Sequence, residues 1–361
     1  MPSPIRTELT LPADQRLLRL VQDYVLALAA MAEFPADQAQ PLAQAVWEAC
    51  RNCIEHAFDE DEAGAFTLVG ELTPAALTLS VCDRGLPFDQ SLDPAEPPAD
   101  PEGPAPAGRS GTGLSLIHHC ADEVCWLNHG PEGKELRLTK YLSGSCRLEQ
   151  KPVAPSLHHE AARPGVTRDY AIRRLGPEDA IRVAQLMYHV YGYTYSNEDF
   201  YYPDRLAHDL ETGAHVGVVA VAANVEIVGH VGVERPRLGP LAELGQLAVA
   251  PAHRGQGLKK LMGDRLQEEI LRLGLAGLYG EAVTIHTISQ EGSESRGLHV
   301  CGVKLLDWQA RFKKVQTLHP GLAPQECEAP QRETMVFYFK YLGPPAPALI
   351  CAPSRVAVRR A

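Results

Sequence analysis

Residues 143–167 constrain the fold of this chain more than any other segment. They carry three prolines and show no apolar periodicity, so they predict a linker between domains and not a packed element. The chain has 361 residues, which exceeds the usual size of a single domain. We therefore expect one domain over residues 1–142, a second over 168–342, and a tail over 343–361.

The two halves differ in charge. Residues 1–142 contain 22 acidic and 9 basic side chains, a net charge of −13, whereas the rest of the chain has a net charge of +2. An acidic first domain argues against direct nucleic-acid binding, because phosphate neutralisation needs clustered lysine and arginine. The sequence has no long apolar run and no signal-peptide pattern at its start, so we expect a cytoplasmic protein without a membrane span.

The nine cysteines are scattered, which indicates free buried thiols. Cys50 and Cys53 form a C-x-x-C inside a helical pattern. A redox pair or half of a zinc site is the alternative there, although no second pair stands at ligand spacing.

The first domain shows alternating helical and strand-like patterns. A proline-rich stretch, 93–107, is incompatible with regular structure and predicts a loop. The expected elements are a short opening strand, helices over 13–32 and 35–58, strands over 65–72 and 76–82, a helix over 113–122, and strands over 123–126 and 135–141.

The apolar pattern of the second domain predicts strands and helices in a mixed order. This order places the whole protein in the α/β (α+β) class. The expected order is strand 170–175, helices 178–191 and 203–211, strands 216–223, 226–234 and 241–249, helix 258–273, strand 278–285, then a short helix and two further strands.

Three separate signals in the first domain point to a nucleotide. Glu48 and Asn52 stand four residues apart and share one helix face, so a carboxylate and an amide project together. Such a pair suits a base beside a Mg²⁺ ligand. Asp83 and Gly85 end a strand, where a carboxylate can accept a hydrogen bond from an adenine amino group. The glycine-rich run around Gly111 and Gly113 opens a helix whose amides could bind phosphate.

These motifs, in this order, resemble the GHKL ATPase superfamily, specifically its anti-sigma-factor serine-protein kinase branch, across residues 5–142. EACRNCIEHAF, VCDRGLPFD and GRSGTGLSLIHHCADEV carry the resemblance. It implies an α/β sandwich that binds ATP and Mg²⁺ under a lid formed by 93–107. It further implies an anti-anti-sigma (STAS-type) protein or a sigma factor as partner. The roles it implies are Glu48 as general base, Asn52 as Mg²⁺ ligand, Asp83 and Gly85 as adenine contacts, and Gly111 and Gly113 as phosphate-loop glycines.

In the second domain, the run from Glu243 to Met262 predicts a strand, a tight basic turn and a helix. Gly255 and Gly257 let backbone amides converge on a pyrophosphate, with a plain strand-to-helix turn as the alternative. The run resembles the acyl-CoA loop of the GNAT N-acetyltransferase superfamily, except that Lys259 replaces its last small residue. Across 168–342 the resemblance implies a mixed sheet flanked by helices and acetyl-CoA as cosubstrate, bound by Leu247, Val249, Arg254, Gly255, Gln256, Gly257 and Leu258.

Direct acetyl transfer to an amine requires a base and an acid. Glu243 stands where members of the family place the base, and the alternation of a strand puts it on one face with Leu247 and Val249. A salt-bridged glutamate is the alternative. The family's tyrosine acid is missing, since Leu298 stands in the corresponding segment. The candidates to replace it are Cys301, His299, His286 and water.

The acceptor site is predicted by polar residues at the end of the strand over 278–285, namely Glu281 and His286. The tyrosines at 188, 191, 193 and 195 are either an acceptor wall or core packing. Together these features predict a bifunctional signalling protein, an ATP-binding kinase-like domain fused to an acetyltransferase acting on a protein lysine or small amine. The alternative is a non-catalytic regulator that binds ATP and a partner and senses acetyl-CoA. A homodimer is left open.

Overall fold

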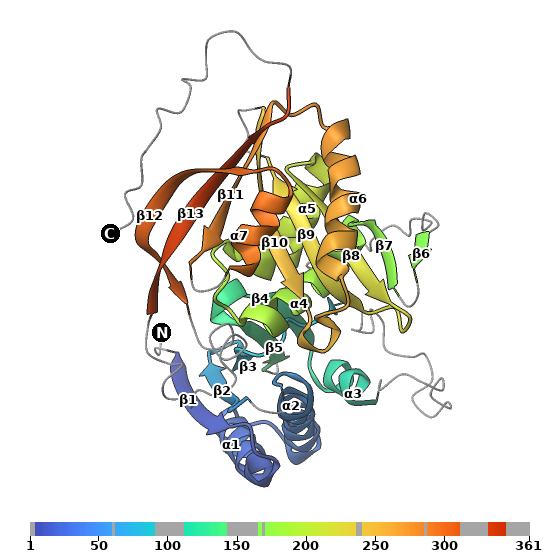
Figure 1. Ribbon diagram of the computed structural model, residues 1–361. Helices are drawn as coiled ribbons and strands as arrows, with labels where there is room; N and C mark the ends of the chain where they lie inside the picture. Colours follow the sequence, from blue (N-terminus) through green and yellow to red (C-terminus); the bar gives the residue numbers. More distant parts are fainter. Residues whose placement is uncertain are drawn as a thin grey trace. The chain divides into compact units, whose positions relative to one another are not determined.

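The computed structural model describes residues 4–59, 62–90, 112–142, 165–167, 170–235, 240–284, 287–310 and 331–343. The chain divides into two compact units, residues 1–161 and 162–361, and each is described by itself (Figure 1). Within the described ranges, no helix has the length and apolar character needed to cross a membrane.

The first unit is a five-stranded antiparallel sheet in the order β1-β2-β3-β5-β4. Neighbouring strands of the sheet are also consecutive in the sequence except at the β3–β5 step, which pairs Asp83 with Lys134 and Ala76 with Tyr141. The elements are β1 (Ile5–Pro12), α1 (Leu18–Met31), α2 (Ala36–His56), β2 (Ala65–Leu72), β3 (Ala76–Asp83), α3 (Thr112–Cys120), β4 (Glu123–Asn128) and β5 (Lys134–Tyr141).

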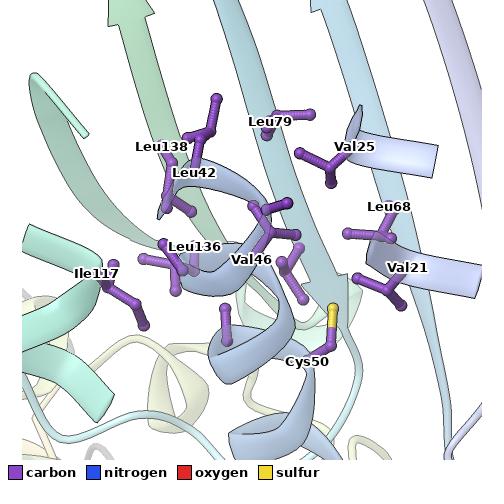
Figure 2. Packing of buried hydrophobic residues seen from close by; sticks show 14 of the residues in the cluster. Val21, Val25, Leu42, Val46, Cys50, Leu68, Leu79, Ile117, Leu136 and Leu138 are labelled. Carbon is purple, nitrogen blue, oxygen red and sulfur yellow. The ribbon is translucent and has the colours of Figure 1, made fainter. Parts of the chain in front are cut away.

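One face of this sheet packs against the helices. Val46 and Cys50 of α2 lie among inward-facing strand residues such as Leu79 and Leu138, and all four are completely buried (Figure 2). Buried residues alternate along β2, and β3 contributes Leu77, Leu79 and Val81, so that the two strands supply the sheet's half of this core. Burial of apolar area at roughly 25 cal/mol per Å² drives the packing and fixes α2 against the sheet.

The second unit is an eight-stranded mixed sheet in the order β12-β13-β11-β10-β9-β8-β7-β6. Its described pairs are antiparallel except β10 with β11. The elements are β6 (Gly165–Thr167), β7 (Tyr170–Arg174), α4 (Ala180–Tyr191), the 3-10 helix η5 (Glu198–Tyr201), α5 (Pro203–Thr212), β8 (His215–Ala222), β9 (Ile227–Glu234), β10 (Leu241–Val249), α6 (Leu258–Arg272), β11 (Gly277–Val283), α7 (Ile288–Ser295), β12 (His299–Ala310) and β13 (Gln331–Tyr341).

Helices cover both faces of this sheet. Val219 and Val221 of β8 pack with α4 and α5, whereas Val216 and Val218 pack with α6. This arrangement explains the uninterrupted burial of seven residues in β8, because a strand covered on both sides reads as a continuous apolar run.

Two irregularities in β10 create the opening of the sheet. Its parallel pairing with β11 covers only Leu241 to Glu243. Its antiparallel pairing with β9 then shifts register between Gly245 and Ala248, with Gln246 at a φ of 56°. One extra residue is thereby inserted in β10, which bends the strand at a β-bulge.

The element order expected from the sequence is confirmed in both units, with boundaries that differ by a few residues. Residues 165–167, at the end of the expected linker, form β6 and pair with β7. The proline-rich loop over 93–107 and the tail beyond residue 343 lie outside the described residues.

The burial of the first core predicts a measurable asymmetry between two leucines. We expect Leu79→Ala, at a fully buried position, to lower the free energy of unfolding by about 2–5 kcal/mol, because it leaves a cavity. Leu20→Ala, at a position 49% exposed on α1, serves as the control and should cost less than about 1 kcal/mol. Hydrogen exchange of β2 and β3 peptides in the full chain measures both. Equal protection in the two variants would contradict the assigned packing.

Candidate functional site

The predicted nucleotide residues of α2 meet the beginning of α3. A Cβ atom placed on Gly113 would lie 3.2 Å from Glu48 Oε2 and 3.6 Å from Asn52 Nδ2. Glycine therefore allows the first turn of α3 to approach the carboxylate and the amide together. The two side chains share one face, as their spacing predicted, and the amides at a helix start favour an anion beside them.

Glu48 has a cationic neighbour on its own helix. The Arg51 Nη2 atom lies 2.7 Å from Glu48 Oε2, and its guanidinium carbon is 5.3 Å from the centre of the Trp47 ring. The Glu48 side chain is only 12% exposed. Its carboxylate is therefore paired with Arg51 through one of its two oxygens.

Asp83, the expected adenine contact, is engaged within the protein. Its Oδ1 atom accepts a hydrogen bond from the Gly85 amide at 2.9 Å and from Lys134 Nζ at 2.5 Å. The two charged side chains are 4% and 10% exposed, so this is a buried ion pair. Lys134 was not predicted from the sequence, because only the β3–β5 register places it opposite Asp83.

Close packing surrounds this ion pair. A Cβ atom on Gly85 would collide with the carbonyl oxygen of Ala57, at the end of α2. Gly133 has a φ of 98°, and a Cβ atom there would collide with the carbonyl oxygen of Asp83. Both glycines are thus required by backbone approach, and Gly85 serves the packing of α2 on β3.

Burial raises the pKa of both thiols of the C-x-x-C pair, and the nearby Asp83 raises it further. Cys50 and Cys53 therefore stay protonated, which disfavours the thiolate needed for metal binding or redox exchange. Among the described residues, no cluster of three metal-ligating side chains is found. Gly111 and the expected lid over 93–107 lie outside the described ranges.

In the second unit, the turn between β10 and α6 has the geometry of an anion site. Gly255 and Gly257 have φ values of 76° and 74°, and a Cβ atom on either would have no neighbour within 4 Å. Helix α6 begins at Leu258 without a side-chain cap, so its first amides point into this open space. The Arg254 Nε atom donates to the Val249 carbonyl at 3.1 Å and ties the turn to the end of β10.

Lys259, which departs from the acyl-CoA loop pattern, does not crowd this turn. Its side chain extends to α7, where a Cβ atom on Gly292 would collide with it. Arg296 makes the reciprocal contact: its guanidinium occupies the space that a Cβ atom on Gly263 of α6 would need, and its Nη2 donates to the Lys259 carbonyl at 3.2 Å. Two glycines therefore admit two cations between α6 and α7.

The expectation that Glu243, Leu247 and Val249 share a face of β10 is wrong. The bulge inserts one residue between them and reverses the alternation of the strand. Leu247 and Val249 consequently pack toward α6, whereas Ala248 packs toward α4 on the face of Glu243.

Two tyrosines, one buried and one partly buried, hold the bulge. The Gln246 amide donates to the Tyr195 hydroxyl at 3.1 Å, and the Tyr191 hydroxyl donates to the Leu247 carbonyl at 2.6 Å. Tyr188 and Tyr193 stack edge to face in the same aromatic group. Tyr188 and Tyr193 are therefore core packing. Tyr191 and Tyr195 satisfy backbone atoms that the bulge removes from the sheet ladder, and they also line a cavity beside β10.

A cavity of about 170 Å³ lies where β10 leaves β11. It brings together two residues that the sequence singled out separately, Glu243 and Glu281, and the cations of Lys259 and Arg296 also line it. His286 lies outside the described residues. Further lining residues are Tyr191, Tyr195, Gln246, Leu247, Ser289 and Ser293.

The carboxyl group of Glu243 has a raised pKa of about 7. Burial is the main cause, and the neighbouring carboxylates of Glu234 and Glu281 add to it, whereas a hydrogen bond with Tyr279 opposes it. A carboxyl group with this pKa exists in both protonation states near neutral pH, which suits a general base.

Two of the residues considered as replacements for the tyrosine acid, Cys301 and His299, are exposed and are not among the residues that line this cavity. Cys301 is exposed, and its sulfur contacts the Phe337 carbonyl at 3.5 Å. Leu298 is 2% exposed in a small apolar cluster with Ala282, Val336 and Tyr338. On α7 the cavity is lined by small residues and Arg296.

Two family models match this chain in separate regions. Residues 11–140 match the histidine kinase-like ATPase domain, and residues 181–287 match the acetyltransferase (GNAT) family. The serine-protein kinase RsbW of Bacillus subtilis (strain 168) is 30% identical over 142 residues, which cover 38% of this chain and 86% of that protein. RsbW of Bacillus mycoides (strain KBAB4) is 29% identical over 139 residues, 38% of this chain and 85% of that protein.

Solved structures similar to this chain include two acetyltransferases. Ribosomal-protein-alanine N-acetyltransferase from Brucella melitensis is 18% identical and covers 47% of this chain and 99% of that chain, with a TM-score of 0.37. The GNAT-family acetyltransferase from Streptococcus pneumoniae is 15% identical and covers 48% of this chain and 100% of that chain, with a TM-score of 0.38.

The fold and the family models define an ATPase-type domain joined to an acetyltransferase-type domain. The chain belongs to the histidine kinase-like ATPase family through its first unit, in a GHKL domain related to RsbW, and carries a GNAT-family domain in its second.

The buried ion pair in the first unit predicts a large effect of one lysine. We expect Lys134→Met to lower the free energy of unfolding by about 3–5 kcal/mol, because it leaves Asp83 buried without its cation. Lys140→Met is the matched control: Lys140 pairs with Asp122 at 3.0 Å with side chains 19% and 34% exposed, so its loss should cost about 1 kcal/mol or less. Hydrogen exchange of β3 and β5 peptides in the full chain compares the two. A smaller loss for Lys134 than for Lys140 would refute the pairing.

Proposed function

We propose that the second unit transfers an acetyl group from acetyl-CoA to an amine, with Glu243 as the general base. The observation that carries this proposal is the half-buried Glu243 carboxyl group, whose pKa is raised to about 7, in the cavity at the divergence of β10 and β11. Glu281 lines the same cavity and is proposed to contact the acceptor.

The turn after β10 supports acetyl-CoA as the donor. Positive-φ glycines, open space and an uncapped helix start give the Gly255–Leu258 backbone the properties of a pyrophosphate site, and Arg254 and Gln256 complete it. We propose that the backbone of Leu247 and Val249 orients the donor beside the bulge. The bulge places Leu247 and Val249 on the α6 face of β10 and Glu243 on the opposite face. The proposed donor contacts and the proposed base are therefore on different faces of the strand.

The chemistry then follows from a single proton transfer by the protein. Glu243, as a carboxylate, accepts the proton of the incoming ammonium group and leaves a neutral nitrogen. This nitrogen forms the new C–N bond as the C–S bond of the thioester breaks. The new amide nitrogen then gives its second proton to the departing thiolate, so that the products are the neutral amide and the CoA thiol. The cations of Lys259 and Arg296, which line the cavity, stabilise the negative charge on the leaving side.

For the first unit we propose ATP binding and serine phosphorylation of a small protein partner of the anti-anti-sigma (STAS) type. The relatives named serine-protein kinases and the convergence of Glu48, Asn52 and Gly113 support this. Asn52 would hold Mg²⁺, which supplies charge neutralisation for phosphoryl transfer. Glu48 would accept the proton of the serine hydroxyl.

One observation favours a non-catalytic alternative for the first unit. Lys134 is paired with the carboxylate of Asp83, the expected adenine contact. Adenine would have to compete with this buried ion pair, which lowers the expected affinity for the nucleotide. In that case the unit captures a partner, and the protein senses acetyl-CoA through the second unit. We propose the first form, a bifunctional signalling protein, and keep the non-catalytic regulator as the alternative. Its free cysteines favour a reducing compartment such as the cytoplasm.

The role of Glu243 predicts a distinctive pH profile. In the wild-type protein kcat/KM should rise with pH and level off above about 7, because the base acts only when deprotonated and its pKa is raised to about 7. Glu243→Gln should remove this inflection and lower kcat/KM about 10²–10⁴-fold. Initial rates of CoA release from acetyl-CoA, between pH 5.5 and 9, measure both.

Two controls separate the base from the fold of the cavity. The Gln variant should still bind acetyl-CoA in a calorimetric titration. Glu281→Gln should retain an inflection but move it below pH 7, since one of the negative charges that raise the pKa of Glu243 is gone. An unchanged profile in Glu243→Gln would transfer the role to another residue.

The role of Glu48 predicts a separation of phosphorylation from nucleotide binding. We expect Glu48→Ala to reduce phosphate transfer to a STAS-type partner at least about 100-fold while ATP still binds, since Asn52 and Asp83 are retained. Glu55→Ala, on the same helix and also near Arg51, is the matched control. Radiolabel transfer from ATP and a calorimetric titration measure the two quantities. Phosphorylation by Glu48→Ala at the wild-type rate would rule out this base.

A further inference from the structure

The second unit contains another cavity, of about 260 Å³, that none of the roles above uses. It lies where β9 ends and β8 begins, next to η5 and α5. Its polar lining residues are Asn197, Asp199, Asp209, His215, Glu234 and Arg235.

His215 is an unsatisfied polar side chain in this lining. It is 2% exposed, and within the described residues neither of its ring nitrogens has a hydrogen-bond partner. Burial, together with the neighbouring His230, holds its pKa well below the usual range, so the ring is neutral and offers one nitrogen as an acceptor. A buried group of this kind normally has a partner, which indicates that a polar ligand or water completes it.

Glu234 gives the cavity a negative character. Its Oε1 atom accepts from Asn197 Nδ2 at 2.7 Å and from Gln246 Nε2 at 2.9 Å, and both of these donors are neutral amides. Burial raises the pKa of Glu234, and Asp209 and Asp199 raise it further. Carboxylates crowded in this way are stabilised by a bound cation.

One arginine pairs with a lining carboxylate, and another lines the cavity itself. Arg205 pairs with Asp199 at 2.9 Å, and both side chains are about half exposed to solvent. Arg235 donates from Nη1 to the Gly213 carbonyl at 3.4 Å, and its buried Nε atom has no hydrogen-bond partner among the described residues. The Phe200 ring also lines the cavity, with its centre 5.3 Å from the centre of the His215 ring, and an aromatic face is a further favourable neighbour for a cation.

Strand register connects this cavity to the base. His215 pairs with Glu234, and Glu234 pairs with Glu243, so the three side chains stand in one row on the same face of neighbouring strands. Neighbouring strands are about 5 Å apart, so the cavity begins about 5–10 Å from Glu243 along this row. Gln246 joins the two places, since it lines the cavity of Glu243 and donates to Glu234.

We propose that this cavity is an acceptor subsite that binds a second ammonium group, through Glu234, Asp209 and His215, while the reacting nitrogen lies at Glu243. The acceptor class is therefore an alkyl diamine whose second nitrogen is about 5–10 Å from the first, a span of four or five methylene groups. This inference rests on the proposed acetyl transfer and specifies which class of amine accepts the acetyl group.

The test compares two acceptors that differ by one charged group, 1,4-diaminobutane and 1-aminobutane. We expect the wild-type kcat/KM to be about 10–100-fold higher for the diamine, the size of effect that a charge-assisted hydrogen bond in a partly buried site produces. Asp209→Asn should remove at least about tenfold of this preference, mainly through KM for the diamine, and should leave the monoamine unchanged.

Asp204→Asn is the matched control, because Asp204 is an exposed residue of α5 that loses the same charge outside the cavity. Asp199→Asn is a second lining variant if Asp209→Asn has a lowered melting temperature. Equal kcat/KM for the two amines in the wild type, or equal effects of Asp209→Asn and Asp204→Asn, would overturn the proposal. A preference for an amine that carries a carboxylate would overturn it in favour of Arg235 as the recognising group.

A direct titration separates this inference from the proposed activity. Calorimetry with 1,4-diaminobutane should show binding to the wild type and to Asp204→Asn, and at least about tenfold weaker binding to Asp209→Asn. If neither amine is acetylated but this binding pattern is observed, the proposed transfer fails and the cation site stands. If 1-aminobutane is acetylated but the diamine binds no more tightly than the monoamine, the transfer stands and the cation site fails.

Discussion

The hydrogen bonds that Tyr191 and Tyr195 make with the β10 backbone determine most of what the second unit can do. A β-bulge removes backbone groups from the sheet ladder, and leaving them unpaired in the interior would cost about 1–3 kcal/mol each. Tyr195 accepts from Gln246, and Tyr191 donates to the Leu247 carbonyl, which holds the bulge at one place. The faces of β10 are reversed beyond it, so that Glu243 looks toward α4 and the following residues toward α6.

The two units hold their proposed bases in opposite electrostatic states. Glu48 is paired with Arg51, one helical turn away, through one of its two oxygens. Glu243 lies among other carboxylates, and its charge is opposed by burial and by like charge. The second arrangement suits a site that is ready for proton transfer near neutral pH.

Much of the fold and several site residues were predictable, because they depend on local pattern. Helical spacing located α2 and placed Glu48 beside Asn52, and the strand, glycine turn and helix around Gly257 stand next to one another in the sequence. The Asp83–Lys134 pair was not predictable, since it depends on the register between β3 and β5. The bulge was missed for a related reason. Gly245 inside the strand is a signal of a bulge, but it does not fix the inserted position, and the tyrosines that stabilise the bulge lie about 50 residues earlier.

The paired glycines between α6 and α7 have a consequence for how this domain can diverge. Lys259 fits because position 292 has no side chain, and Arg296 fits because position 263 has none. A relative with a small residue at position 259 would have space beside position 292, which a side chain larger than glycine could fill. Conversely, a relative with a larger side chain at position 292 would need a shorter one at position 259. The two pairs of positions are therefore expected to change together across sequences, and their covariation would record the interlocking of these helices.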